Sequence, residues 1–140
     1  MLREAATVAS PYEGRPQRDG KPEDILNRTY RYALRAIRLY QYLQGQRDGA
    51  GWIIGKQLLR AATSIGANIE EAQASESRTD FAHKVGIAQK EARESLYWLR
   101  LLQDAALVPA SRLNPLWEET KELVAILTTI VVKTKSKLKR

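Results

Sequence analysis

The 140-residue sequence contains no cysteine, which excludes disulfide frameworks, thiolate metal sites and cysteine nucleophiles. A single histidine, His83, is too few for a di-iron helical bundle, and we interpret it as a partly exposed helix residue. No run of about eighteen uncharged apolar residues occurs, and the first ten residues hold no sustained apolar segment. We therefore expect a cytoplasmic protein with no membrane-spanning helix, no signal peptide and no metal or other cofactor.

Recognisable catalytic arrangements are missing as well. Ser64 has no histidine or lysine at a spacing typical of nucleophilic catalysis, and no glycine-rich phosphate loop is present. The neighbouring glutamates Glu70 and Glu71, or Glu91 and Glu94, could act as acid/base pairs, but such helix charges usually form solvated or interface salt bridges. We therefore expect a protein that binds a partner and is not an enzyme.

Positive charge is abundant, and much of it lies at the C-terminal end. The formal net charge is +7 at pH 7 and the isoelectric point is about 9.8. The last eight residues contribute five positive charges without any acid: Lys133, Lys135, Lys137, Lys139 and Arg140. This distribution indicates a polyanionic partner that binds a basic tail and local basic stripes rather than a uniformly basic surface.

The length of the chain permits one hydrophobic core, so we predict a single folded domain. Residues 1–23 contain three of the five prolines and few large apolar side chains, which is typical of a flexible leader. From Asp24 onward, apolar residues recur every three or four positions, which is the period of an α-helix. The sequence thus predicts a leader over 1–23, a helical bundle over 24–135 and a basic tail over 136–140.

Four amphipathic helices are expected, over residues 24–45, 52–74, 78–107 and 115–135, with a loop at 45–51. Ser77 with Asp80 resembles a capping box, and Asn114 is expected to cap the last helix ahead of Pro115. Short connections favour an all-α, up-and-down antiparallel four-helix bundle. The predicted core residues are Leu26, Tyr30, Ala33, Leu34, Ile37 and Tyr40; Leu58, Ala62, Ile65, Ile69 and Ala72; Phe81, Val85, Ala88, Ala92, Leu96, Leu99 and Ala106; and Leu116, Thr120, Leu123, Leu127, Ile130 and Val131.

Two features of the middle helices suggest contacts beyond the core. The helix over 78–107 has a second apolar strip, which contains Ile87, Trp98 and Leu101 and predicts a neighbouring subunit. The helix over 52–74 has a polar line along one edge, made of Arg60, Ser64, Asn68 and Glu71. This line is either a buried hydrogen-bond network that fixes helix register or a subunit contact, or it is a ligand surface. We favour the first interpretation because polar groups beside alanine and glycine usually face protein.

Basic side chains form stripes on two of the helices. The first helix gathers Arg28, Arg31, Arg35 and Arg38 on one side with no acid among them. The third helix carries Lys90, Arg93 and Arg100 with Tyr97 between them. A solvated face is the ordinary role of such rows, but the clustering predicts contact with nucleic acid, either RNA or DNA. An acidic protein partner is the alternative.

The segment from Gln57 to Ile69, QLLRAATSIGANI, together with Ser77, Asp80-Phe81, Ala88, Glu94, Tyr97-Trp98-Leu99 and Leu101-Leu102, resembles the bacterial ribosomal intervening-sequence proteins. The resemblance covers about a third of the chain. Glu70 replaces a small residue of the family pattern and Ala72 replaces a glycine, so the packing at this helix end is expected to differ.

The resemblance implies a homopentameric barrel of four-helix bundles without known catalysis. It also implies kinship with the accessory variability determinant of diversity-generating retroelements, a basic bundle that binds a reverse transcriptase and its template RNA. The expected partners are therefore further copies of the chain, nucleic acid and a reverse transcriptase.

Overall fold

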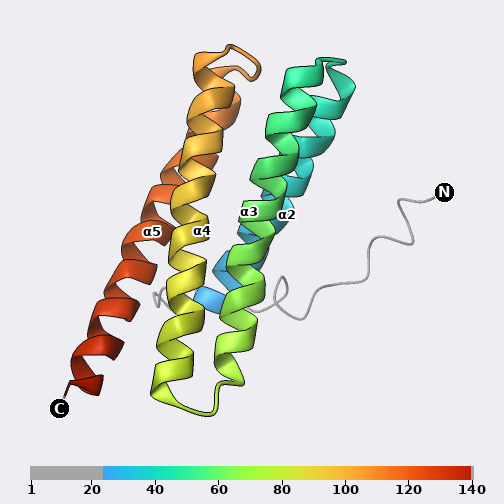
Figure 1. Ribbon diagram of the computed structural model, residues 1–140. Helices are drawn as coiled ribbons and strands as arrows, with labels where there is room; N and C mark the ends of the chain where they lie inside the picture. The colour runs from blue at the N-terminus through green and yellow to red at the C-terminus, as the bar shows by residue number, and fades with distance from the viewer. Residues whose placement is uncertain (1–23, 140) are drawn as a thin grey trace, which may run out of the picture.

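The computed structural model describes residues 24–139, so the predicted leader over 1–23 and Arg140 lie outside the described part. Four α-helices make up its regular structure: α2 (Ile25–Gly45), α3 (Gly49–Gln73), α4 (Arg78–Asp104) and α5 (Ala110–Leu138). Successive helices run antiparallel and are joined by short turns (Figure 1). The all-α, up-and-down four-helix prediction is confirmed for this part of the chain. None of its helices combines the length and the apolar character needed to cross a bilayer.

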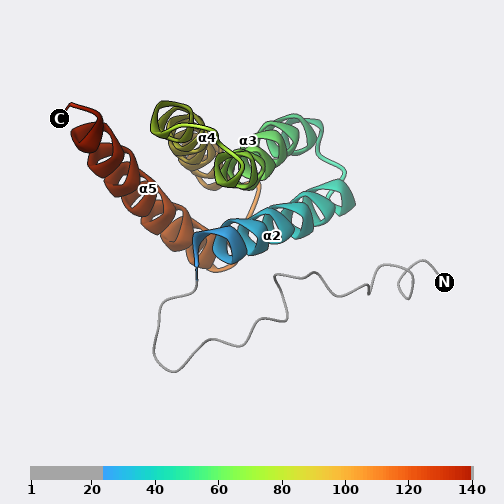
Figure 2. The same cartoon turned by 90° about the horizontal axis from the view of Figure 1, so that it is seen from below.

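The four helices do not contact one another equally. α3 packs along both α2 and α4, and α4 packs along both α3 and α5. The contact between α2 and α5 is much smaller, because the two helices lie close near the start of α5 and diverge toward its C-terminus (Figure 2). α2 and α4 therefore lie diagonally across the bundle.

Aspartate and serine side chains cap the first three helices. Asp24 accepts a hydrogen bond from the Asn27 amide at 2.9 Å, and Ser77 accepts one from the Asp80 amide at 3.0 Å, which is the serine half of a capping box. Asp48 caps α3 by accepting from the amides of Ala50 and Gly51. The predicted loop over 45–51 is therefore too long, because residues 49–51 already belong to α3. The Asp48 cap stabilises this earlier start by accepting from first-turn amides that would otherwise lack a partner.

The start of α5 differs from the prediction. The helix begins at Ala110 with Pro109 at its N-cap, so Asn114 is no cap and Pro115 lies inside the helix. Val108 and Leu113 are buried, and their burial stabilises the earlier helix start. This gain outweighs the loss of one backbone hydrogen bond at the nitrogen of Pro115. At its other end the helix continues to Leu138, so residues 136–138 of the predicted tail are helical. Lysines in the last turn favour this extension because they oppose the negative end of the helix dipole.

The core is as predicted on α3 and largely on α5, where Ile130 is only half-buried. On α4, Phe81 and Leu96 are half-buried and Ala106 lies beyond the helix, whereas Ala82, Ser95 and Leu102 are buried.

On α2 the predicted stripe is wrong. Its six members are half-buried or, like Ile37 at 37%, exposed. The buried stripe instead contains Tyr32, Ala36, Leu39 and Leu43. Both stripes have helical spacing, but the second is the one that is buried in the core of the bundle.

The end of α4 contains an alanine in the left-handed conformation. Ala106 has φ +56°, the Leu107 amide donates to the Leu102 carbonyl at 3.0 Å, and the Ala106 amide donates to Gln103 at 3.0 Å. This pair of bonds is a Schellman motif, which usually has glycine at this position because a Cβ is strained there.

We predict that Ala106→Gly raises the free energy of unfolding by about 0.5–1 kcal/mol, because it removes that strain. Urea denaturation of the variant measures the effect. Ala105→Gly is the matched control, since Ala105 has φ −81° and gains nothing from glycine. A variant at Ala106 that is less stable than the wild type would contradict the strain argument.

Candidate nucleic-acid interface

Three arginines of α2 form an open basic surface. Arg31 and Arg38 are exposed and Arg35 is half-buried, and together with Leu34 they line a hollow of about 370 Å³. The sequence has no acid between Arg28 and Asp48, so α2 itself supplies no compensating charge along this surface. We call Arg31, Arg35 and Arg38 the α2 arginine row.

The fourth predicted arginine, Arg28, has a different role. Its guanidinium donates to Glu119 from Nε at 2.8 Å and from Nη2 at 2.7 Å, and it also pairs with Glu122. The hydrogen bonds to Glu119 raise the pKa of Arg28 above its usual range. Arg28 therefore clamps α2 to α5, and a phosphate contact by this residue would have to break the clamp.

A buried hydroxyl pair joins the same two helices beneath the α2 arginine row. The Tyr32 and Thr120 oxygens are 2.6 Å apart, and Thr120 donates its own proton to the Leu116 carbonyl. Tyr32 is therefore the donor in the pair. Burial raises the pKa of the Tyr32 phenol to about 12, against the smaller opposite effects of Thr120 and Ser95. This pair fixes the position of α2 against α5, and so the position of the row.

The α4 basic strip, Lys90, Arg93 and Arg100 with Tyr97, is exposed as predicted. None of its three cations forms an ion pair with the described part of the chain. Tyr97 is 49% exposed and packs edge-on against Trp98 with ring centroids 4.9 Å apart. The strip and the α2 arginine row lie on helices that are diagonally opposed in the bundle and do not pack against each other (Figure 2).

The C-terminal lysines form a third and separate basic region. The side chains of Lys133, Lys135, Lys137 and Lys139 are exposed at the far end of α5, away from the start of that helix (Figure 1). Arg140 lies outside the described residues.

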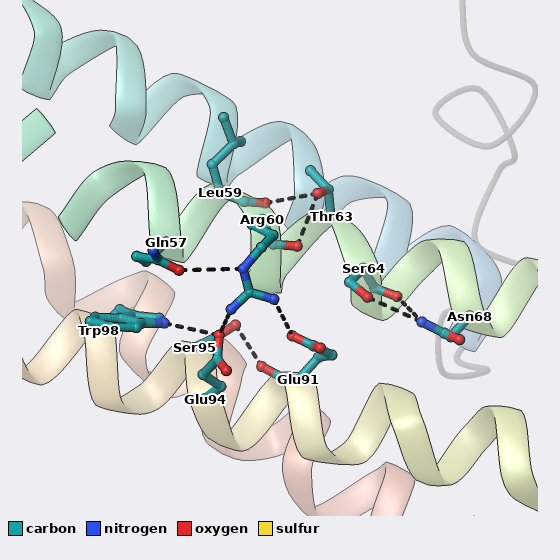
Figure 3. Close-up of polar contacts among 10 residues, drawn as sticks. All are labelled: Gln57, Leu59, Arg60, Thr63, Ser64, Asn68, Glu91, Glu94, Ser95 and Trp98. Carbon is teal, nitrogen blue, oxygen red and sulfur yellow. Dashed lines mark hydrogen bonds and ion pairs between the residues drawn. The ribbon is translucent and has the colours of Figure 1, made fainter. Parts of the chain in front are cut away.

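The predicted polar line of α3 does not form one continuous network (Figure 3). Arg60 pairs with Glu94 and, at 3.4 Å, with Glu91 of α4, and the Trp98 indole donates to Glu94 at 3.1 Å. Asn68 donates only within α3, to the Ser64 carbonyl at 2.8 Å and its hydroxyl at 3.1 Å. At the other end of the line, Glu71 accepts from Lys84 of α4 at 2.9 Å.

Within one protomer this line is not a buried network, and a subunit contact along it stays a prediction. The side chains of Arg60 and Glu71 are 51% and 60% exposed, so these ion pairs are surface bridges between α3 and α4 and stabilise little. Ile87, Trp98 and Leu101, the predicted subunit strip of α4, are half-buried in the protomer.

Sequence reasoning missed one further arginine beside this row, Arg112. It lies in the first turn of α5, where its guanidinium stacks 4.1 Å from the centre of the Tyr42 ring and joins Arg35 and Arg38 around a second hollow. The reason is the expected helix start at Pro115, which placed Arg112 in a linker.

His83 is exposed, and no group of three or more His, Asp or Glu side chains in the described part could hold a metal ion.

Residues 22–129 match the family model described as 23S rRNA-intervening sequence protein. The fold is similar to a 1.70 Å crystal structure of a protein of unknown function from the S23 ribosomal protein family of Bacteroides thetaiotaomicron, with 35% identity and a TM-score of 0.73. That match covers 77% of this chain and 98% of the other. No curated protein matches the chain significantly.

The buried Tyr32 phenol should make stability depend on alkaline pH. Its folded pKa of about 12 exceeds the value of about 10 for an unfolded tyrosine, so its stabilising effect is complete below pH 10 and is lost as the pH rises toward 12. We expect the free energy of unfolding to fall by about 2–3 kcal/mol over this range, because the folded and unfolded pKa values differ by about two.

Urea denaturation of the wild type and Tyr32→Phe between neutral pH and the alkaline range measures this effect as a difference. The wild type should be the more stable at pH 7, and its advantage should disappear above about pH 10. Tyr97→Phe is the control, because it removes a hydroxyl from an exposed ring. Parallel pH profiles for the wild type and Tyr32→Phe would rule the effect out.

Proposed function

Since the chain belongs to the 23S rRNA-intervening sequence protein family, we propose that it is a non-enzymatic nucleic-acid-binding protein, with RNA as its principal ligand. The observation that carries this proposal is the basic surface at the junction of α2 and α5. Its two hollows share Arg35 and Arg38, and among residues 24–139 no acid lines either of them.

The glutamates in the first half of α5 pair with other cations and so do not neutralise Arg35 or Arg38. Glu119 and Glu122 accept from Arg28, and Glu118 pairs with Lys121 at 3.2 Å. Within the α2 arginine row, Arg35 and Arg38 form no ion pair with the described part of the chain and so present positive charge to solvent. Binding of a phosphate backbone to such a row releases condensed counterions, which makes affinity fall as salt rises.

The proposal includes assembly into a homo-oligomer, with the pentamer implied by the family resemblance. Apolar side chains are exposed outside the core of the protomer, among them Ile37 on α2 at 37%, Trp52 at 43% and Ile53 at 68% on α3. A second copy packed on such side chains would remove them from water. Assembly would also bring the α2 arginine row, the α4 strip and the C-terminal lysines of different copies into one larger basic surface. Such an assembly could hold a nucleic-acid enzyme, such as a retroelement reverse transcriptase, on its RNA.

The test is the salt dependence of RNA affinity for the double variant Arg35→Gln/Arg38→Gln. We expect the affinity at low salt to fall at least tenfold, and the slope of log Kd against log salt to fall by about 0.7 for each lost phosphate contact. Fluorescence anisotropy with a mixed-sequence single-stranded RNA measures both quantities, and light scattering coupled to size exclusion reports assembly.

Arg47→Gln/Arg78→Gln is the matched control, because it removes the same charge from exposed sites away from the two hollows. Equal losses in both double variants would reduce the proposal to general charge attraction. A wild type that binds no RNA even at low salt would overturn it and favour an acidic protein partner.

A further inference from the structure

A small hollow lies where α2 and the first turns of α5 meet. Its volume is about 200 Å³, and its lining residues are Arg35, Arg38, Leu39, Arg112 and Leu116. Leu39 and Leu116 are buried and form an apolar wall, whereas three of the five lining residues are arginines. Arg35 and Arg38 form no ion pair or hydrogen bond with the described part of the chain.

The arrangement of these arginines is electrostatically unfavourable for the protein alone. Arg112 is the third residue of α5, so it lies in the helix turn where the dipole is positive and a cation is disfavoured. Pro109 provides no side-chain cap that could offset this charge. The ring of Tyr42 holds the Arg112 guanidinium in place without neutralising it. An anion bound in the hollow would be attracted by all three arginines and by the positive end of the α5 dipole, and it would offset their mutual repulsion.

We infer that this hollow is a phosphate-binding pocket, with Arg35, Arg38 and Arg112 as its ligands. A carboxylate has two oxygens, which suit a single guanidinium fork, whereas a terminal phosphate has three and can accept from several forks. An internal phosphodiester has two unesterified oxygens and would engage fewer of the three arginines. The apolar wall lowers the local dielectric, which strengthens these bonds. This inference deepens the proposed function and rests on it for the natural ligand, a phosphate group of an RNA strand.

The neighbouring hollow indicates the path of the strand. Arg35 and Arg38 line both hollows, and the second one continues along α2 to Leu34 and Arg31. A strand with one phosphate in the pocket would place its next phosphates against the α2 arginine row. The pocket phosphate is then either the 5′-terminal group of the strand or an internal phosphodiester.

The first experiment tests the pocket without RNA. Thermal unfolding is followed in phosphate and in chloride buffers of equal ionic strength, for the wild type and Arg112→Gln. Phosphate should stabilise the wild type more, and titration should give a phosphate affinity about tenfold lower in the variant, the usual effect of losing one charge-assisted interaction. Circular dichroism verifies that the variant is folded.

Arg78→Gln is the control for this experiment. Arg78 is an exposed arginine at the first position of α4, so its replacement makes the same change of charge at another helix start. Since the general effect of phosphate on stability is common to all three proteins, only a loss specific to Arg112→Gln supports the pocket. Equal phosphate effects in all three proteins would overturn it.

The second experiment identifies the source of the phosphate. One single-stranded RNA is prepared with a 5′-phosphate and with a 5′-hydroxyl, and both are titrated with the wild type and Arg112→Gln. A 5′-phosphate that strengthens binding only to the wild type assigns the pocket to the strand end. Equal weakening of both RNAs by Arg112→Gln assigns it to an internal phosphodiester.

The two proposals fail in different ways. If RNA binds with strong salt dependence and Arg112→Gln changes neither RNA affinity nor the phosphate effect, the pocket is wrong and the proposed function stands. If the phosphate effect depends on Arg112 but no RNA binds, the pocket stands and the proposed function is wrong.

Discussion

The attachment of α2 to α5 is the interaction on which the surface of this protein depends. These helices share far less packing than the other neighbours, because α5 diverges from α2 along its length (Figure 2). Two polar contacts hold them instead: the buried hydroxyl pair of Tyr32 and Thr120, and the pairing of Arg28 with Glu119 and Glu122. A buried hydrogen bond depends strongly on geometry, so it fixes the rotation of α2 more narrowly than apolar packing alone would.

The same contacts determine which charges stay available to a ligand. Arg28 pairs with Glu119 and Glu122 of α5, whereas Arg35 and Arg38 share their hollow with Arg112 and two buried leucines. Stability and binding are thus coupled: the clamp that holds the helices together also removes the counter-charges of the basic surface. A protein optimised for stability alone would not place three arginines around one hollow at a helix start, and such local conflicts are typical of binding sites.

The three basic regions have different relations to the fold. The α2 arginine row belongs to a junction between helices and is shaped by it, whereas the α4 strip and the C-terminal lysines lie on single exposed helix faces. Exposed lysines and arginines on one helix attract any polyanion, but they do not fix its orientation. Guanidinium groups held by two helices can do so, because their forks are preorganised.

The sequence by itself determined the helical class, the cap at Ser77, the core face of α3 and the family, because short-range spacing and local hydrogen bonds produce these features. Tertiary structure decided which of the two apolar stripes of α2 is buried, since a period of three and four residues does not say which face a neighbour covers. It also decided where α5 begins, because buried Val108 and Leu113 outweigh a local proline signal. The hollow with Arg112 depends on both decisions: the rotation of α2 and the start of α5 bring together arginines more than seventy positions apart in the chain.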